Sequence, residues 1–185
     1  MSGNAVRVQH LQTQQWPDLR DIRLRALADA PHAFGATLRE AQARTELQWR
    51  ARLVDRTQFL ATVSSESVGV VAVALDPDPH TAHLMSMWVD PAHRGGPVAD
   101  ALIQAVIDRA TTWRCTRLRL EITNGNHRAE NAYARHGFAR TGRNGPLDTD
   151  QSRSEFGMAL TLTSTPPSSD PAAAFGVDST GLARP

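Results

Sequence analysis

The stretch from Met85 to Ala110 constrains the fold more than any other part of the chain. It opens with the alternating apolar residues of a strand, breaks at Asp90-Pro91, and passes through a short basic loop that contains Gly95-Gly96. From Pro97 onward, apolar residues recur at the spacing of an amphipathic helix, and proline is favoured in a first helical turn. The stretch therefore predicts a strand, a small-residue loop and a helix in direct succession.

A helix that begins in this way gathers hydrogen-bond donors at one point. Its first backbone N–H groups have no partner within the helix, and the positive end of the helix dipole lies beside them. Such a terminus is suited to phosphate, and Arg94 adds a planar cation next to it. The glycine spacing matches neither the dinucleotide-binding pattern G-x-G-x-x-G nor the P-loop pattern G-x-x-x-x-G-K-[ST]. The alternative is a plain strand–turn–helix corner without a ligand.

The loop resembles the acyl-CoA loop of the GNAT family of N-acetyltransferases, in which a V-x-P-x-x-R-G-x-G-x-G/A run follows a strand. The corresponding residues here are Val89, Pro91, Arg94, Gly95, Gly96, Val98 and Ala99. Pro97 departs from the pattern, because it stands where the family has its second glycine, whose N–H faces the pyrophosphate. Proline has no N–H group. The resemblance therefore implies an acyl-CoA site with one pyrophosphate contact fewer.

Residues 118–138 resemble the other signature of this family, L-x-L-x-V-x-x-x-N-x-x-A-x-x-x-Y-x-x-x-G-F. The matching positions are Leu118, Leu120, Ile122, Asn126, Ala129, Tyr133, Gly137 and Phe138. The two signatures stand in the expected order and, with the elements around them, cover nearly all of residues 6–162. Agreement of two partial motifs is more specific than either motif alone.

The resemblance implies roles for several residues. Backbone N–H groups of Met87, Trp88 and Val89 would hold the pantetheine and the acetyl oxygen, which is stabilisation of the oxyanion type. Asn126 would bind the pantetheine amide. Tyr133, the only tyrosine in the chain, would protonate the leaving thiolate. The alternative for Tyr133 is a core aromatic residue whose hydroxyl has a partner.

Glu121 is the candidate general base. It lies on the polar face of a strand predicted for residues 117–123, and some ribosomal-protein acetyltransferases of the family carry a base glutamate at the matching position. A carboxylate there could take the ammonium proton directly or through water. The alternative is an exposed carboxylate that pairs with Arg117 or Arg119. The two interpretations are equally supported.

Phe34 and Glu121 are the expected contacts of the acceptor. The D-A-P-x-A-F-G-x-T run around Phe34 is similar to a bacterial branch of the family, and the paired helices after the first strand resemble the family's substrate-side elements. Phe34 and Trp49 could instead fill the core, and for Trp49 this is the favoured interpretation.

Periodicity predicts a single α/β (α+β) domain over residues 1–163. The expected order is β-α-α-β-β-β-α-β-α-β-β, and the resemblance implies a mixed, mostly antiparallel sheet of about seven strands with four flanking helices. The last two strands are expected at 138–141 and 155–162. Residues 164–185 are rich in proline and serine and lack periodicity, which predicts a disordered tail.

Composition narrows the partners and the compartment. The net charge is only +1, so no nucleic-acid surface is expected. No stretch approaches the apolar length of a membrane span, and the N-terminus has no apolar segment of signal-peptide length, so no membrane partner is expected. Cys115 is the only cysteine, which fits a reducing cytoplasm. No His, Cys, Asp and Glu cluster has metal-ligand spacing, so no metal is expected.

The leading hypothesis is an enzyme that transfers the acetyl group of acetyl-CoA to a primary amine by direct attack in a ternary complex. The acceptor could be a small molecule or a peptide. The alternative is a non-catalytic acyl-CoA-binding or regulatory module on the same fold, which Pro97 supports. A third hypothesis is a loop that selects another acyl-CoA or binds CoA weakly. Dimers are frequent among relatives, so the resemblance leaves a homodimer open.

Overall fold

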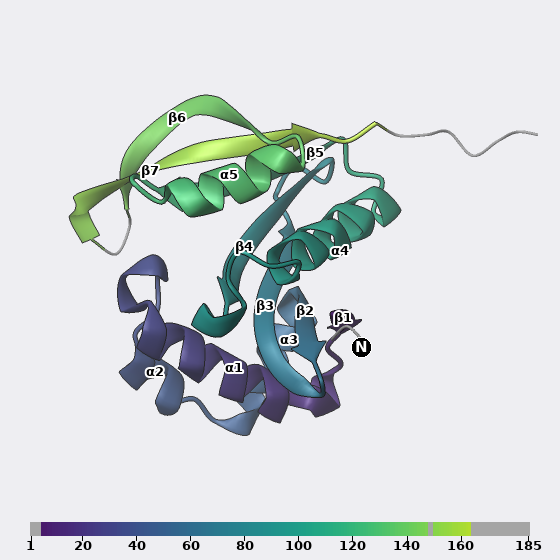
Figure 1. Ribbon diagram of the computed structural model, residues 1–185, viewed down its shortest axis with the longest axis vertical. Coiled ribbons are helices and arrows are strands. Elements are labelled where there is room, and N and C mark those ends of the chain that lie inside the picture. Colours follow the sequence, from purple (N-terminus) through teal and green to yellow (C-terminus); the bar gives the residue numbers. More distant parts are fainter. Residues whose placement is uncertain (1–4, 148–149, 164–185) are drawn as a thin grey trace, which may run out of the picture.

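A computed structural model describes residues 5–147 and 150–163. Its centre is a seven-stranded sheet in the order β1-β2-β3-β4-β5-β7-β6 (Figure 1). Neighbouring strands are antiparallel except β4 and β5, which run parallel. The strands are β1 (Arg7–His10), β2 (Thr57–Val63), β3 (Glu66–Leu75), β4 (Thr81–Val89), β5 (Arg117–Thr123), β6 (Ala139–Leu147) and β7 (Asp150–Thr161). The predicted α/β fold with a mixed, mostly antiparallel sheet is confirmed.

The described residues form five α-helices, namely α1 (Trp16–Asp29), α2 (Leu38–Gln42), α3 (Glu46–Asp55), α4 (Val98–Thr112) and α5 (His127–Arg135). The sequence predicted four of them, and α2 is the addition. It has only five residues, too few to show an amphipathic period. A capping box starts it: the Thr37 hydroxyl accepts from the N–H of Glu40, and the Glu40 carboxylate accepts from the N–H of Thr37.

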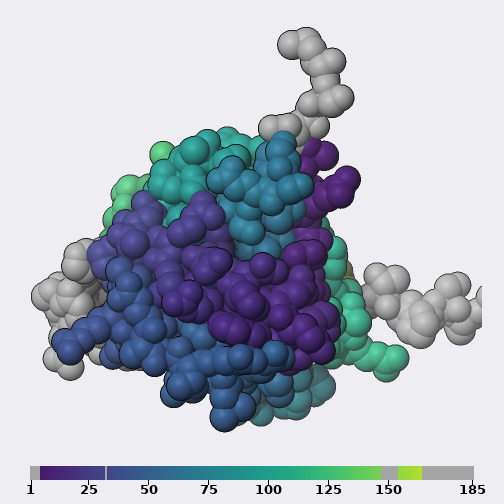
Figure 2. All heavy atoms as spheres, turned by 90° about the horizontal axis from the view of Figure 1, so that it is seen from below, coloured from purple at the N-terminus to yellow at the C-terminus, as the bar shows by residue number. Residues whose placement is uncertain are grey.

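The helices cover the sheet from two sides and so create two cores. Leu102 and Val106 of α4 share one core with Tyr133 of α5 and the central strands. The helices α1 and α3 contribute to the other core, which contains Trp49 at 0% exposure, as its core interpretation predicted. Figure 2 shows the N-terminal helices, in purple and blue, spread over this second side.

Helix α4 approaches β3 closely at Gly69. A Cβ atom at this position would lie 2.9 Å from Leu102 Cδ1 and 3.0 Å from Val98 Cγ1. Gly69 also pairs with Val89, the last residue of β4. The missing side chain thus lets the first turn of α4 rest on the sheet beside the end of β4.

Strand β4 separates from its neighbour β5 towards its C-terminal end. Its register with β3 shifts between Val70 and Ala72, so Ser86 and Met87 together face one residue of β3. This is a β-bulge, and Ser86 has a φ of +59°. On the other side, only Thr81–His83 pair with β5. The two parallel strands therefore diverge beyond His83 and leave a gap between them.

Strands β6 and β7 extend beyond the predicted ranges 138–141 and 155–162. Strand β6 continues through polar residues because its backbone pairs with that of β7. The register between the two strands shifts after Arg140 and after Pro146. Residues 164–185, where the tail was predicted, lie outside the described residues. Within the described ranges, no helix has both the length and the apolar character needed to cross a membrane.

Candidate active site

A cavity of about 880 Å³ lies between the end of β4, the start of α4 and one face of α5. Most of the predicted cofactor-binding residues line it, namely Met87, Trp88, Val89, Arg94, Gly95, Gly96, Ala99, Asn126 and Tyr133. Val98 is the exception, since its side chain is buried and packs near Gly69. Phe34 reaches the same cavity from the connection between α1 and α2.

A smaller cavity of about 140 Å³ shares Phe34, Met87, Asn126 and Tyr133 with the larger one. Glu121 of β5 lines this smaller cavity. The candidate acid and the candidate base therefore border one small space, at the gap where β4 and β5 diverge.

Helix α5 holds Asn126 and Tyr133 in place. Asn126 is the N-cap of this helix: its Oδ1 accepts a hydrogen bond from the N–H of Ala129 at 3.1 Å. Its side-chain NH2 has no partner among the described residues. The ring of Tyr133 meets Phe138 edge-on, with 5.5 Å between centroids. Gly137 follows the helix with a φ of +87°, a left-handed conformation that favours glycine.

The Tyr133 side chain combines a packed ring with a free hydroxyl. The residue is 5% exposed and belongs to the core on the α4 side. Its hydroxyl has no hydrogen-bond partner in the described part of the chain, so the alternative of a core tyrosine with a satisfied hydroxyl finds no support. Burial raises the pKa of the phenol, because it disfavours the charged form. The hydroxyl therefore stays protonated at neutral pH.

Glu121 is surrounded by positive or proton-donating groups. Its Oε2 lies 2.7 Å from His83 Nε2, Arg119 donates to its Oε1, and Arg143 is 4.0 Å away. The hydrogen bond from His83 is the main cause that lowers the pKa of Glu121, and the nearby charges add to it against the effect of burial. The pairing with Arg119 occurs as one interpretation predicted, but the side chain is only 18% exposed. Glu121 is thus ionised at neutral pH and lines a cavity.

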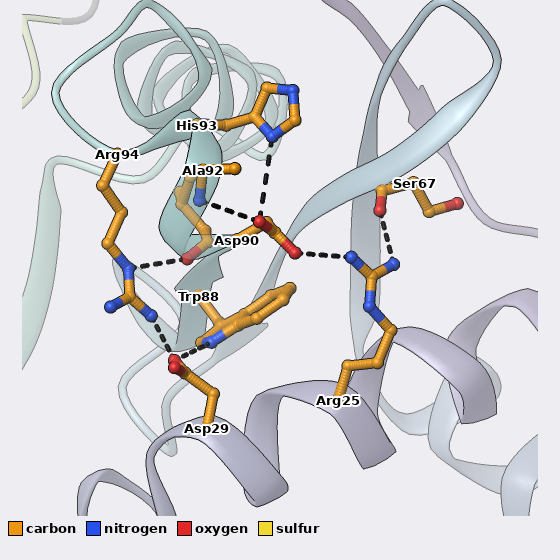
Figure 3. Close-up of polar contacts among 9 residues, drawn as sticks. Arg25, Asp29, Ser67, Trp88, Asp90, Ala92, His93 and Arg94 are labelled. Atoms are coloured by element: carbon orange, nitrogen blue, oxygen red, sulfur yellow. Dashed lines mark hydrogen bonds and ion pairs between the residues drawn. The ribbon is translucent and has the colours of Figure 1, made fainter.

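Asp29, the last residue of α1, joins that helix to the end of β4 and the loop (Figure 3). Its carboxylate accepts a hydrogen bond from Trp88 Nε1 at 2.8 Å and pairs with Arg94. The hydrogen bond from Trp88 is the main cause that lowers the pKa of Asp29, and Arg94 adds to it. The Nε of Arg94 also donates to the Val89 carbonyl at 2.9 Å. The guanidinium of Arg94 is therefore held against the wall of the large cavity.

A second carboxylate, that of Asp90, fixes the turn after β4. It accepts from the N–H of Ala92 at 2.9 Å and pairs with Arg25 of α1 at 2.6 Å. Arg25 also donates to the Ser67 carbonyl at 2.7 Å, as Figure 3 shows. The hydrogen bond from Ala92 is the main cause that lowers the pKa of Asp90. The loop is thus tied to α1 and, through Arg25, to β3.

The wall of the large cavity is positively charged near the start of α4. Arg94, Arg128 and Arg135 line it, and Asp100 is the one carboxylate among its lining residues. Asp100 pairs with Arg135 at 2.8 Å and with His136 at 3.1 Å. Backbone N–H groups of the first turn of α4 lie at the same end. Such a wall favours a phosphate-bearing ligand.

The sequence matches the model of the acetyltransferase (GNAT) family over residues 15–138, more than half of the chain. The chain belongs to the GNAT family. No curated protein matches it.

Solved GNAT structures share the fold. An acetyltransferase of the family from Streptococcus pneumoniae superposes with a TM-score of 0.73 at 15% identity, covering 86% of this chain and 100% of that one. The ribosomal-protein-S18-alanine N-acetyltransferase from Escherichia coli gives 0.63 at 20%, covering 89% and 98%. A putative acetyltransferase from Salmonella typhimurium, solved with its cofactor acetyl-CoA, gives 0.67 at 17%, covering 92% and 100%.

Two contacts of this GNAT protein escaped the sequence analysis. The sequence motifs singled out neither Asp29 nor His83. Both make their contacts with residues far along the chain, Asp29 with Arg94 and His83 with Glu121. No local sequence pattern indicated either pair.

Proposed function

We propose that this protein is an N-acetyltransferase that moves the acetyl group of acetyl-CoA to a primary amine by direct attack in a ternary complex. The observation that carries the proposal is the small cavity bordered by both Tyr133 and Glu121, next to a larger cavity suited to a phosphate-bearing ligand. A protonated phenol and an ionised carboxylate are the two groups that amine acetylation needs. A non-catalytic acyl-CoA-binding module would need only the larger cavity.

The chemistry of acetyl-CoA fits the residues of the large cavity. The pyrophosphate would lie at the start of α4, near Arg94 and Arg128. The β4 edge that faces away from β3 is unpaired with β5 beyond His83, so its backbone groups are free for the pantetheine amides. The unpartnered NH2 of Asn126 can donate to a pantetheine carbonyl. The Salmonella neighbour, solved with acetyl-CoA, supports the same donor.

The reaction follows from these groups. Glu121 takes a proton from the acceptor ammonium, directly or through water, and the free amine attacks the thioester carbonyl carbon. Backbone N–H groups around Met87 stabilise the negative charge that develops on the carbonyl oxygen. The C–S bond then breaks, and the departing thiolate takes the proton of the Tyr133 hydroxyl. The nitrogen gives its second proton to the Tyr133 phenolate, directly or through water, and Glu121 releases the first proton to solvent. The products are an acetamide and CoA, with one proton released overall.

The acceptor is a primary amine on a small molecule or a peptide. Phe34 and Met87 give the small cavity apolar walls, and Glu121 gives it one carboxylate that attracts an ammonium group. Acidic residues of α1, α2 and α3 already have partners within the protein. Glu40 caps α2, Glu46 pairs with Arg50, and Asp29 is engaged by Trp88 and Arg94.

Calorimetric titration with acetyl-CoA, followed by thiol release across a panel of amines, tests this function. We expect a dissociation constant on the order of micromolar, which corresponds to about −8 kcal/mol. Release of CoA thiol should require both the amine and the protein. Absence of binding at millimolar acetyl-CoA would contradict the donor, and binding without thiol release from any amine would favour the non-catalytic module.

Pro97 should weaken acetyl-CoA binding, and Pro97→Gly should tighten it by about ten- to a hundredfold. Pro97 stands at the N-cap of α4 and lines the large cavity, but it offers no N–H to a phosphate. A charge-assisted hydrogen bond contributes roughly 1.5–3 kcal/mol, which is about one to two decades in affinity. The dissociation constants of both proteins, measured by calorimetry, check this expectation.

Two further variants distinguish the effect of the missing N–H on acetyl-CoA affinity from the effect of backbone flexibility. Pro97→Ala restores the N–H without the flexibility of glycine, so it should also tighten binding. Pro79→Ala changes a proline of the turn between β3 and β4, outside both cavity linings, and should leave the affinity unchanged. An unchanged or weaker affinity in both Pro97 variants would remove the missing N–H as the cause.

A further inference from the structure

His83 lies behind Glu121 at the corner of the gap between β4 and β5. It is the last residue of β4 that pairs with β5, where its partner is Arg119. Its Nε2 is 2.7 Å from Glu121 Oε2, and its side chain is 23% exposed. His83 lines neither of the two cavities. It therefore touches the candidate base without reaching the space of the acceptor amine.

The strand register accounts for this contact. Side chains two residues apart on a strand share one face, so Glu121 lies on the same face as Arg119, the pairing partner of His83. Beyond His83 the strands diverge. The imidazole thus spans the point where the gap opens and contacts the carboxylate that lines it.

We propose that His83 is the positioning residue for Glu121, holding its carboxylate against the wall of the small cavity, where it meets the acceptor amine. The proposal rests on the proposed function, in which Glu121 is the general base. Each carboxylate oxygen can accept about two hydrogen bonds. The contacts with His83 and Arg119 therefore leave capacity for the ammonium group of the acceptor.

Other charged groups near Glu121 are less suited to this role. Arg119, on the same strand, is shared with Asp76, whose two oxygens both accept from it. Arg143 of β6 is 74% exposed and 4.0 Å away. From α5 the facing group is the uncharged phenol of Tyr133, and the paired residue on β7 is Gly157. Asp76 of the turn after β3 also interacts electrostatically with His83, but Glu121 is the ion-pair partner of His83 in the described ranges. The hydrogen bond from His83 is the main cause that lowers the pKa of Glu121.

Carbon-13 NMR of the ligand-free protein tests the contact without any need for activity. The chain has six glutamates, so labelling their side-chain carboxyl carbons gives few signals, and Glu121→Gln identifies the one of interest. The hydrogen bond from His83 lowers the pKa of Glu121, so His83→Leu should raise the titration midpoint of this signal. His83→Gln keeps an N–H donor and should give a smaller rise. The control is His127→Leu, which removes one of the two partners of Glu130 and should leave the Glu121 signal unmoved.

Steady-state kinetics at neutral pH tests the role itself. His83→Leu should lower kcat by about tenfold, because a misplaced base loses its productive geometry. The acetyl-CoA KM should stay unchanged, and His83→Gln should recover most of the turnover. An unmoved Glu121 titration in His83→Leu would overturn the proposal, as would full turnover in that variant. Failure of the wild-type protein to acetylate any amine would instead contradict the proposed function. The NMR titration would still test the contact between His83 and Glu121.

Discussion

Tyr133→Phe should lower kcat by about 10²- to 10³-fold, which lies within the range that a positioned general acid contributes. The phenol is buried, its pKa is raised, and its hydroxyl has no partner among the described residues. Removal of the oxygen therefore leaves no buried group unsatisfied. The ring keeps its edge-on contact with Phe138, so the fold and the cavity wall should persist. The departing thiolate, by contrast, loses its proton donor.

Rapid-quench measurement of a single turnover is the appropriate test, because it isolates the chemical step from product release. The acetyl-CoA dissociation constant of the variant should change by less than about twofold. Thermal unfolding of both proteins controls for stability. An unchanged single-turnover rate would take Tyr133 out of the acid role.

Glu121→Gln should lower kcat/KM at neutral pH by about 10²- to 10³-fold. The substitution keeps the size of the side chain but removes the proton acceptor. The hydrogen bond from His83 holds the pKa of Glu121 below its ordinary value, so the wild-type base stays ionised as pH falls towards the acidic range. The wild-type rate is therefore sustained at neutral pH, where the acceptor is mostly an ammonium ion.

The pH dependence of the variant gives the sharper readout. Without a base, turnover depends on the fraction of free amine, so the rate should rise with pH until the pKa of the acceptor, about 8 for an N-terminal amine or about 10.4 for a lysine-like amine. The defect should shrink accordingly on the alkaline side. Glu130→Gln, a glutamate of α5 outside both cavities, serves as the control. A defect of constant size at every pH would assign the base elsewhere.

Clear periodicity made most of the fold predictable. β5 has the predicted bounds, because alternation of apolar residues there is regular. The extension of β6 had no such signal, since residues 142–147 are largely polar or glycine and pair through their backbone alone. Helix α2 is too short for a period, but its capping box at Thr37 and Glu40 was present in the sequence.

The site could be predicted only where its residues belong to a sequence motif. The loop and the helix of Asn126 and Tyr133 follow recognisable patterns, and the structure brings them to one cavity. The contacts of Asp29 with Trp88 and Arg94 depend on how α1 packs against the sheet, and that of His83 with Glu121 depends on a parallel register. Neither relation follows from local sequence.

The divergence of β4 and β5 also has a consequence for the resistance of the folded chain to proteolysis. Three residue pairs join β1–β4 to β5–β7 through the sheet, so the gap is a place where the structure can open locally. Under the proposed function, acetyl-CoA would contact both sides of that gap and favour the closed form by mass action. Proteolysis of an opened state depends on its equilibrium population. The rate at which a cell degrades this protein would then fall as the supply of acetyl-CoA rises.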